Sequence, residues 1–230
     1  MTETGQQEGA QQFGNAEANL RFLEAAGALT PGTEVLEIGT GTGGLLNELL
    51  RRGLRARGVE INPALIADSR KWYGELPVQM VSDVTLPFQD AAFDLVLSFD
   101  VLEHIRNSDA HLTEVSRVLR PGGRYLVQTP SKWPNTVFET IRWKSFTRWR
   151  DDHCALHTPE QLRRRLAAHG FAVRFFDIPV VNEFFRSKVR RHLGWPGVAL
   201  LTLANPDRLP VKWRTNLYVQ ATRAATNTHG

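Results

Sequence analysis

Glycines and carboxylates at a fixed spacing form the most informative group in this chain. Residues 35–44 read VLEIGTGTGG, and Glu60 closes the next short apolar run. Glycines at 39, 41 and 43 let a strand turn sharply into a helix and let a ligand lie against bare backbone, because no Cβ blocks the approach. A carboxylate about 20 residues further on can contact both hydroxyls of a ribose. This spacing predicts a site for a nucleoside-containing cofactor.

The acidic residue before the glycines decides between two kinds of cofactor. Gly39, Gly41 and Gly44 also satisfy the pattern GxGxxG, which is typical of dinucleotide sites. A pyrophosphate there would meet the carboxylate of Glu37, two residues before the turn, and like charges repel. S-adenosylmethionine carries an ammonium group and a sulfonium and has no phosphate. The charge at Glu37 therefore favours S-adenosylmethionine over NAD.

At these residues the chain resembles the class I S-adenosylmethionine-dependent methyltransferases, and the resemblance extends to about residue 130. Residues 81–84 look like the segment whose carboxylate and following amide hold the adenine. Residues 87–98 look like the fourth strand with its lead-in, and the stretches 101–104 and 119–123 follow at the expected spacing. The resemblance implies that the cofactor is bound by Glu37, Gly39, Thr40, Gly41, Gly43, Glu60, Ile61, Asp83, Val84, Ser98 and Phe99.

Two histidines are candidate bases for methyl transfer. The reaction displaces an excellent leaving group, so an enzyme must align the nucleophile, exclude water and often remove a proton. His104 follows the fourth strand by one turn, and His153 ends an aromatic segment beyond the fifth. Histidine is the side chain that ordinarily titrates near neutral pH, which suits a general base. The alternatives are a packing and capping role for His104 and a surface-loop position for His153.

A metal site is an alternative use of the same residues. Asp100, Glu103 and His104 have the spacing of one face of a helical turn, and His153 would supply a fourth ligand. The ubiquinone-biosynthesis O-methyltransferases and the enzymes that methylate the terminal 2′-hydroxyl of small RNAs have a similar arrangement, with Glu where this chain has Asp100. Because the carboxylate side chain is shorter here, we assign no metal ligand.

The elements that would position these residues alternate along the chain. We expect an α/β fold with a seven-stranded, mostly parallel Rossmann-like sheet and helices on both faces. The resemblance implies the strand order 3-2-1-4-5-7-6, with an antiparallel last strand. The predicted strands are 34–38, 56–60, 78–82, 93–98, 124–129, 171–178 and 216–222, and the predicted helices are 16–28, 43–52, 63–73, 108–119 and 158–169.

Two insertions, 131–157 and 180–214, interrupt the alternation and mix aromatic with basic residues. We expect an irregular loop in the first and a lid over the acceptor formed by both. In this hypothesis Trp143 and Trp149 make apolar contacts, and Arg142 or Arg148 meets a negative group. The alternative is docking on anionic lipid through the basic cluster Arg186, Lys188, Arg190 and Arg191.

Composition limits the remaining choices. The 230 residues are 42% hydrophobic with a formal charge of +4, which predicts one domain over 16–230 after a flexible tail at 1–15. A single cysteine, Cys154, excludes a disulfide framework, and no apolar run reaches the ~20 residues of a membrane span. The protein should be cytoplasmic. The resemblance implies methyl transfer, and the aromatic and basic insertions favour an oxygen nucleophile of a small hydrophobic or anionic metabolite as the acceptor. One alternative is RNA 2′-O-methylation, which is disfavoured because the sequence shows no appended RNA-binding module. The other is a non-catalytic cofactor-binding protein.

Overall fold

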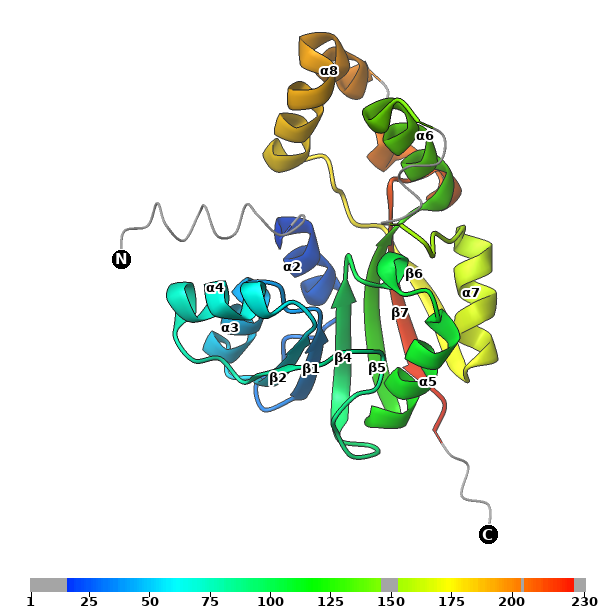
Figure 1. Ribbon diagram of the computed structural model, residues 1–230. Coiled ribbons are helices and arrows are strands. Elements are labelled where there is room, and N and C mark those ends of the chain that lie inside the picture. Colours follow the sequence, from blue (N-terminus) through cyan, green and yellow to red (C-terminus); the bar gives the residue numbers. More distant parts are fainter. Residues whose placement is uncertain (1–15, 146–152, 204, 226–230) are drawn as a thin grey trace.

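A mixed sheet of seven strands forms the centre of the computed structural model, which describes residues 16–145, 153–203 and 205–225, apart from the side chains at 141–143, 184, 188 and 206 (Figure 1). Its strand order is β3-β2-β1-β4-β5-β7-β6, and β7 runs antiparallel to both β5 and β6. The predicted order and the antiparallel last strand are confirmed. The strands are β1 Glu34–Ile38, β2 Arg55–Glu60, β3 Val78–Met80, β4 Phe93–Phe99, β5 Leu119–Pro130, β6 Phe171–Phe176 and β7 Asn216–Arg223.

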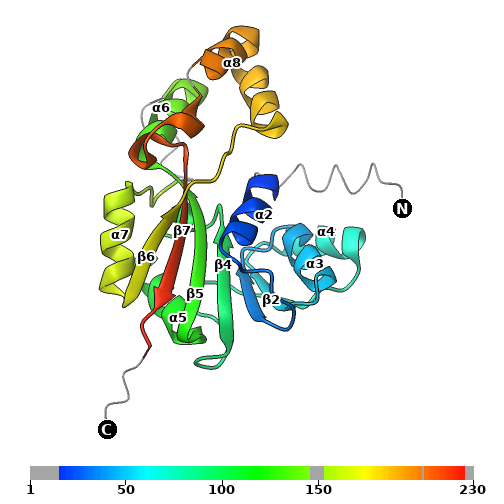
Figure 2. The ribbon, with the colours of Figure 1, turned by 180° about the vertical axis from the view of Figure 1, so that it is seen from behind.

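Helices cover both faces of the sheet (Figures 1 and 2). The helices α2 Ala16–Ala25 and α3 Gly44–Arg51 pack on one face, where Phe22 and Leu46 are fully buried. The helices α5 Ser108–Val118 and α7 Pro159–Ala168 pack on the other face, where Leu112 and Leu162 are fully buried. The helix α4 Pro63–Tyr73 lies against β2 and β3. Buried apolar side chains of this kind each contribute about 1.5–3 kcal/mol, so the two clusters hold the carboxyl ends of the strands in fixed positions.

The fifth strand begins earlier than predicted. We expected Pro121, Gly122 and Gly123 to end the preceding helix, with a strand from residue 124. Instead β5 pairs with β4 from Leu119 onward, and the register shifts between Phe93 and Leu95. The additional residues form an irregularity in which Gly122 has a φ of 77°. Proline and glycine therefore mark a bulge within the strand here.

The insertions lie beyond the carboxyl ends of the strands (Figures 1 and 2). The first begins with the helix α6 Lys132–Trp143, so the expectation of an irregular loop from residue 131 is wrong for this part. Pro134 falls in the first turn of α6, where proline is tolerated because that amide needs no helical partner. The second insertion contains α8 Glu183–Leu203, which is kinked at Gly194, and the short helices η3 Pro206–Arg208 and η4 Val211–Trp213.

Candidate active site

The turn between β1 and α3 exposes bare backbone at the carboxyl edge of the sheet. Gly39, Gly41 and Gly43 have φ values of 76°, 54° and 81°, which side chains rarely adopt. A Cβ on Gly39 would lie 2.4 Å from Cγ2 of Val101, and a Cβ on Gly43 would lie 2.6 Å from Oγ of Ser69. Conformation and packing both require glycine at these two positions. Parallel sheets of this kind bind ligands at this edge.

Glu60 holds the glycine turn in place. Its side chain is buried at the end of β2, and Oε2 accepts a hydrogen bond from the Gly41 amide at 2.8 Å. Its Oε1 accepts from the amides of Ile61 and Asn62, both at 2.9 Å. A carboxylate has about four acceptor positions. One position therefore remains for a ribose hydroxyl, and contact with both hydroxyls requires one of these amides to give up its bond.

Glu37 lies in the middle of the sheet with one carboxyl oxygen unused. The residue is 6% exposed, and its Oε2 has no hydrogen-bond partner among the described residues. Burial, reinforced by the charge of Glu60, raises the pKa of Glu37 to about 8. A buried polar atom without a partner costs roughly 1–3 kcal/mol. An ammonium group would satisfy this oxygen and favour the ionised carboxylate, whereas a pyrophosphate would not.

Three other residues that we predicted to bind the cofactor, at the ends of β1 and β4, are buried or partly buried, and their contact with it stays a prediction. Ser98 is fully buried near the end of β4, and Phe99 is partly buried with its ring centroid 6.1 Å from that of Phe22. Thr40 is 6% exposed, and its hydroxyl lacks a partner within the described residues. The Ser98 and Phe99 side chains therefore help to form the core, while the Thr40 hydroxyl is a free hydrogen-bonding group beside the glycine turn.

The residues predicted to contact the nucleoside lie at the ends of β2 and β3. Ile61 is 62% exposed and follows Glu60 directly. Asp83 is exposed beyond β3, and its Oδ1 accepts a hydrogen bond from the Thr85 amide at 2.7 Å, while Val84 is partly buried. An exposed apolar side chain and a carboxylate at neighbouring strand ends suit a flat base. Their contact with a cofactor stays a prediction.

His104 and His153 lie side by side, although they are far apart in the sequence. His104 ends the short helix η1 Leu102–His104, which follows β4, and His153 lies in the segment that leads to α7. Their ring centroids are 5.1 Å apart and their planes are inclined by 63°. Nδ1 of His153 lies 3.0 Å from Nδ2 of Asn135 in α6. The fold thus brings both candidate bases to the carboxyl end of β4, and their catalytic role stays a prediction.

The helical turn on which the metal alternative depends is absent. Asp100 has a φ of 54° and lies outside η1, which is only three residues long. Glu103 points inward, where it is 1% exposed and accepts a hydrogen bond from the Thr129 hydroxyl at 2.9 Å, while His104 is exposed. Burial, followed by the charge of Asp100, raises the pKa of Glu103 to about 8. Among the described His, Cys, Asp and Glu side chains, no group of three or more is placed to hold a metal ion.

The segment after His153 is anchored to η1. The backbone oxygen of Glu103 accepts a hydrogen bond from the Ala155 amide at 2.9 Å and faces the Cys154 thiol at 3.6 Å. The Lys132 amide donates to the carbonyl of His157 at 3.0 Å. These contacts fix the histidine pair against the sheet. Cys154 is partly buried and contacts backbone, which agrees with a packing role.

A basic groove adjoins this anchored segment. Arg164 lies 3.5 Å from Glu160 and Arg165 lies 3.6 Å from Asp109, whereas no ion pair involves Arg106 within the described part. The groove encloses about 680 Å³, and its lining residues are Arg106, Lys132, Cys154, Ala155, Leu156, His157, Gln161, Arg164 and Arg165. Four cationic side chains around one space favour an anionic group.

His157 is the one strongly buried polar side chain in the lining. It is 6% exposed, and its Nδ1 has no hydrogen-bond partner among the described residues. Burial, followed by the positive charge of Arg165, lowers the pKa of His157 to about 4. The imidazole is therefore neutral at physiological pH, and it adds no positive charge to the lining of the groove.

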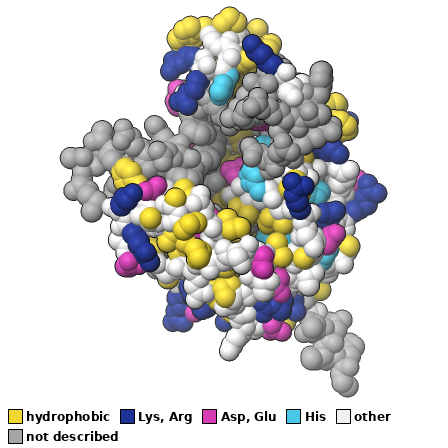
Figure 3. Space-filling view, viewed as in Figure 1, with side chains coloured by type: hydrophobic (Ala, Val, Ile, Leu, Met, Phe, Trp, Pro, Cys, Tyr) yellow, Lys and Arg dark blue, Asp and Glu magenta, His cyan; other side chains and the backbone are white. Residues whose placement is uncertain are grey.

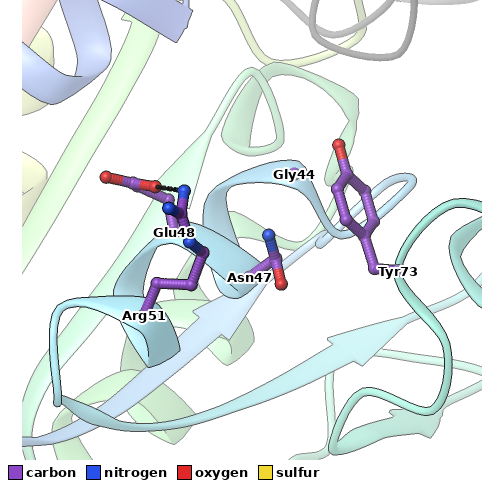
Figure 4. Close-up of a pocket in the computed structure, with 5 residues that line it drawn as sticks. All are labelled: Gly44, Asn47, Glu48, Arg51 and Tyr73. Atoms are coloured by element: carbon purple, nitrogen blue, oxygen red, sulfur yellow. Dashed lines mark hydrogen bonds and ion pairs between the residues drawn. The ribbon is translucent and has the colours of Figure 1, made fainter. Parts of the chain in front are cut away.

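A second cavity lies between α3 and α4 and has a different character. It encloses about 330 Å³ and is lined by Gly44, Asn47, Glu48, Arg51 and Tyr73 (Figure 4). Arg51 and Glu48 form an exposed ion pair across one side of it at 3.3 Å. The cavity lies along the outer side of α3, not at the strand ends that carry the glycine turn, so it is a gap between two helices.

Several residues of the site were not predicted. Gln128 is 2% exposed and holds Asp100 through two hydrogen bonds, from the Asp100 amide at 2.9 Å and to Oδ1 of Asp100 at 3.0 Å. Asn135 and the four cations of the groove were also missed. The sequence shows adjacent arginines at 164 and 165, but it does not show that they lie near Lys132 and Arg106. The predicted lid contacts, which are apolar for Trp143 and Trp149 and with a negative group for Arg142 or Arg148, lie outside the described residues and side chains.

Comparison with known proteins identifies the family. Residues 10–174 match the methyltransferase domain family. The chain is 33% identical over 197 residues to a demethylmenaquinone methyltransferase of Mycobacterium bovis, covering 84% of this chain and 74% of that protein. It is 26% identical over 167 residues to a ubiquinone biosynthesis O-methyltransferase of Aeromonas salmonicida, covering 66% of this chain and 70% of that protein.

The fold also matches solved structures. A Haemonchus contortus phosphoethanolamine N-methyltransferase 2 in complex with S-adenosyl-L-methionine aligns with a TM-score of 0.63 at 18% identity, covering 90% of this chain and 52% of that one. For other curated relatives the chain spans only about two fifths of their length (39% and 42%). The glycine turn, the strand order and the family match agree, and the chain therefore belongs to the class I S-adenosylmethionine-dependent methyltransferases.

Proposed function

We propose that this protein transfers a methyl group from S-adenosylmethionine to an oxygen nucleophile of a small, amphipathic and anionic acceptor. The observation that carries the cofactor half of this proposal is the pair of buried carboxyls under the left-handed glycine turn. Glu60 is bonded to the turn, whereas Glu37 has an unused oxygen and a pKa of about 8. Such a pair suits one ligand with hydroxyl groups at one end and an ammonium group at the other.

The part of the proposal that concerns the acceptor is supported by the basic groove beside the histidine pair. The groove begins at Cys154, next to His153, and at Arg106, two residues beyond His104. An anionic group bound among the cations would lie beside the two imidazoles. The relatives support an oxygen nucleophile only in part, because one is an O-methyltransferase and another is a demethylmenaquinone methyltransferase.

Each residue of the candidate site has a task in the proposed reaction. When bound, the cofactor supplies an electrophilic methyl group and takes up the electron pair of the broken carbon–sulfur bond. Glu37 and Glu60 orient the cofactor, and the groove orients the acceptor so that its oxygen lies in line with that bond. One of the two imidazoles accepts the acceptor's proton, and Asn135 fixes the orientation of His153 through the 3.0 Å contact. The lid hypothesis remains part of this proposal, with α6 and α8 as its described components.

Transfer of labelled methyl groups tests this proposal. The protein is incubated with methyl-labelled S-adenosylmethionine and an alkylphenol that carries a carboxylate, or with the methyl ester of that compound. We expect the label on the phenolic oxygen and a kcat/KM about tenfold higher for the acid, since a hydrogen bond to a charged group contributes about 1.5–3 kcal/mol.

Matched variants separate the groove from general effects of charge. The double variant Arg106→Gln/Lys132→Gln should abolish the preference for the acid, whereas Arg55→Gln, an exposed arginine at the opposite end of the sheet, should not. Equal use of acid and ester by the unmodified protein would refute the anionic acceptor. Label on RNA and on no small acceptor would favour the RNA alternative.

A further inference from the structure

The exposed large apolar side chains of the described residues are concentrated in one stretch of the sequence. Ten large hydrophobic residues are exposed in the described part of the chain, and six of them lie between residues 193 and 213. These six are Leu193, Trp195, Leu200, Leu203, Leu209 and Trp213. We refer to residues 190–203 and 205–213 as the tip. Contiguous exposed apolar surface on a water-soluble domain marks a site of interaction.

The second half of α8 gives the tip its apolar character. The chain changes direction at Gly194, which has a φ of 65°, and residues 195–203 contain no charged side chain. Trp195, Leu200 and Leu203 are 69%, 64% and 86% exposed. Leu200 and Leu203 are three residues apart, so they lie on the same side of the helix. The second half of α8 therefore exposes a tryptophan and two leucines at the surface of the molecule.

Positive charge surrounds this apolar surface. The guanidinium of Arg190 lies 5.4 Å from the ring centroid of Trp195, and Nζ of Lys212 lies 5.8 Å from that of Trp213. The tip contains a single acidic residue, Asp207, whose carboxylate accepts hydrogen bonds from the amides of Val180 and Val181 at 2.9 and 3.0 Å. Tryptophan rings with adjacent cations are suited to a boundary that is apolar on one side and anionic on the other.

The shape and position of the tip indicate its partner. It protrudes beyond the carboxyl ends of the strands, at the same end of the molecule as the candidate active site (Figures 1 and 2). In the space-filling view, hydrophobic side chains gather at the top of the molecule with basic side chains on their flanks (Figure 3). A protruding surface fits a planar bilayer and needs no complementary cavity. No described helix is long and apolar enough to cross a membrane, so contact would be limited to the surface.

We propose that the tip docks on the surface of an anionic lipid bilayer, with Trp195, Leu200 and Leu203 in the interfacial region and Arg190, Arg191 and Lys212 against the lipid headgroups. This proposal does not depend on the proposed methyl transfer, because docking requires neither cofactor nor acceptor. Each basic residue near an anionic membrane raises binding by about fivefold, and buried apolar side chains add to this.

Co-sedimentation of the full chain with vesicles tests the docking. Vesicles of equal parts phosphatidylcholine and phosphatidylglycerol are compared with vesicles of phosphatidylcholine alone. We expect the protein to pellet with the anionic vesicles and to be released as the salt concentration rises, because salt screens the charges. Failure to pellet above the phosphatidylcholine background at low salt would overturn the proposal.

Matched variants assign the binding to the tip. Leu200→Ser/Leu203→Ser should lower the partition constant, the ratio of bound to free protein at a given lipid concentration, at least tenfold. Arg190→Gln/Arg191→Gln should lower it about 25-fold, from about fivefold per charge. Met80→Ser and Arg51→Gln are the controls, because both residues are exposed far from the tip. All of these side chains are exposed, so circular dichroism should show unchanged folding. Equal pelleting of tip and control variants would refute the assignment.

Light scattering distinguishes the bilayer from a second copy of the chain. The tip proposal predicts the same molar mass in solution for the unmodified protein and for Leu200→Ser/Leu203→Ser. A dimer that this double variant converts to monomers would show that the tip is a protein interface, and would overturn the lipid proposal.

Discussion

Two buried carboxyls at the same edge of the sheet have opposite environments. Glu60 accepts hydrogen bonds from three backbone amides, so its negative charge is well solvated by the protein. Glu37 has an unused oxygen and a pKa raised to about 8 by burial and by the charge of Glu60. Glu60 is therefore organised before any ligand arrives, while Glu37 becomes ionised favourably only when a positive group is next to it.

This difference predicts an unusual dependence of stability on pH. Because the pKa of Glu37 is higher in the folded protein than the ordinary 4.5, its contribution to the free energy of unfolding decreases as the pH rises from 4.5 to about 8. The variant Glu37→Gln cannot ionise. In urea unfolding without ligand, we expect the free energy of unfolding of Glu37→Gln to be higher than that of the unmodified protein by roughly 2–4 kcal/mol at pH 8. At pH 4.5 the two free energies should differ little.

Ligand should reverse this order. Saturating S-adenosylhomocysteine supplies an ammonium group, so at pH 8 it should stabilise the unmodified protein more than Glu37→Gln. A stability difference between the two proteins that is independent of pH would mean that the folded pKa of Glu37 is not raised. If the ligand stabilises both proteins equally, its ammonium group does not lie next to Glu37.

The histidine pair gives a second prediction at this scale. If one imidazole accepts the acceptor's proton, His153→Ala or His104→Ala should lower kcat by roughly 10²–10⁴ and leave the affinity for S-adenosylhomocysteine unchanged. Asn135→Ala should lower kcat less, and only through His153. His169→Ala is the control, because that ring bonds to the Arg165 carbonyl at the end of α7. A loss of cofactor affinity equal to the loss of kcat would show that the pair is structural.

At the residue scale the sequence predicted the cofactor edge better than the acceptor side. The glycines and Glu60 could be predicted because their roles depend on local spacing along one strand, turn and helix. The hydrogen bond between Gln128 and Asp100, and the contact between Asn135 and His153, join distant segments. No periodicity in a single sequence reports such contacts. The helical face expected to be shared by Asp100, Glu103 and His104 was wrong, because it assumed α-helical spacing, whereas η1 is a short 3₁₀ turn that does not include Asp100.

Among the elements, the turn from β1 to α3 is the most constrained. Gly39 combines a left-handed backbone with the contact to Val101, so Gly39→Ala meets both a conformational penalty and a steric one. Gly32 has a similar φ of 83° but no atom within 4 Å of an added Cβ. Gly32→Ala therefore measures the conformational penalty alone.

We predict that Gly39→Ala lowers the free energy of unfolding by roughly 2–5 kcal/mol and Gly32→Ala by about 1–2 kcal/mol. Urea unfolding of the two variants checks this. Equal losses in both would show that Val101 gives way without cost and that packing does not explain the glycine at position 39.

Most elements could be predicted, because strands and helices alternate with clear stop signals. The boundaries of β1 and α4 agree with the prediction, since a buried apolar run and an Asn62 cap with Pro63 define them. The start of β5 could not be placed, because Pro121 and Gly122 ordinarily end an element and here lie in a bulge. Helix α6 is amphipathic, so its sequence has a helical pattern, which the prediction of an irregular loop overlooked.

At the scale of the whole molecule, the site and the tip lie at the same end. The carboxyl ends of β1, β2 and β4 carry cofactor residues, and the insertion beyond β6 carries the tip (Figure 1). The groove is formed by the segment after η1, the insertion beyond β5 and α7. The strand order could be predicted from the family resemblance. The basic groove could not, because its cations come from three separate segments and converge only in the folded chain.

Calorimetric titration with S-adenosylhomocysteine and with NAD tests the central claim most directly. We predict that the unmodified protein binds S-adenosylhomocysteine and gives no binding heat with NAD. Glu60→Ala should weaken the affinity by roughly 10–100-fold, through the loss of a charge-assisted hydrogen bond. The surface variant Glu75→Ala, whose carboxylate pairs only with exposed Arg70 among the described residues, should bind as the unmodified protein does. Binding of NAD in place of S-adenosylhomocysteine, or unchanged affinity in Glu60→Ala, would contradict this account.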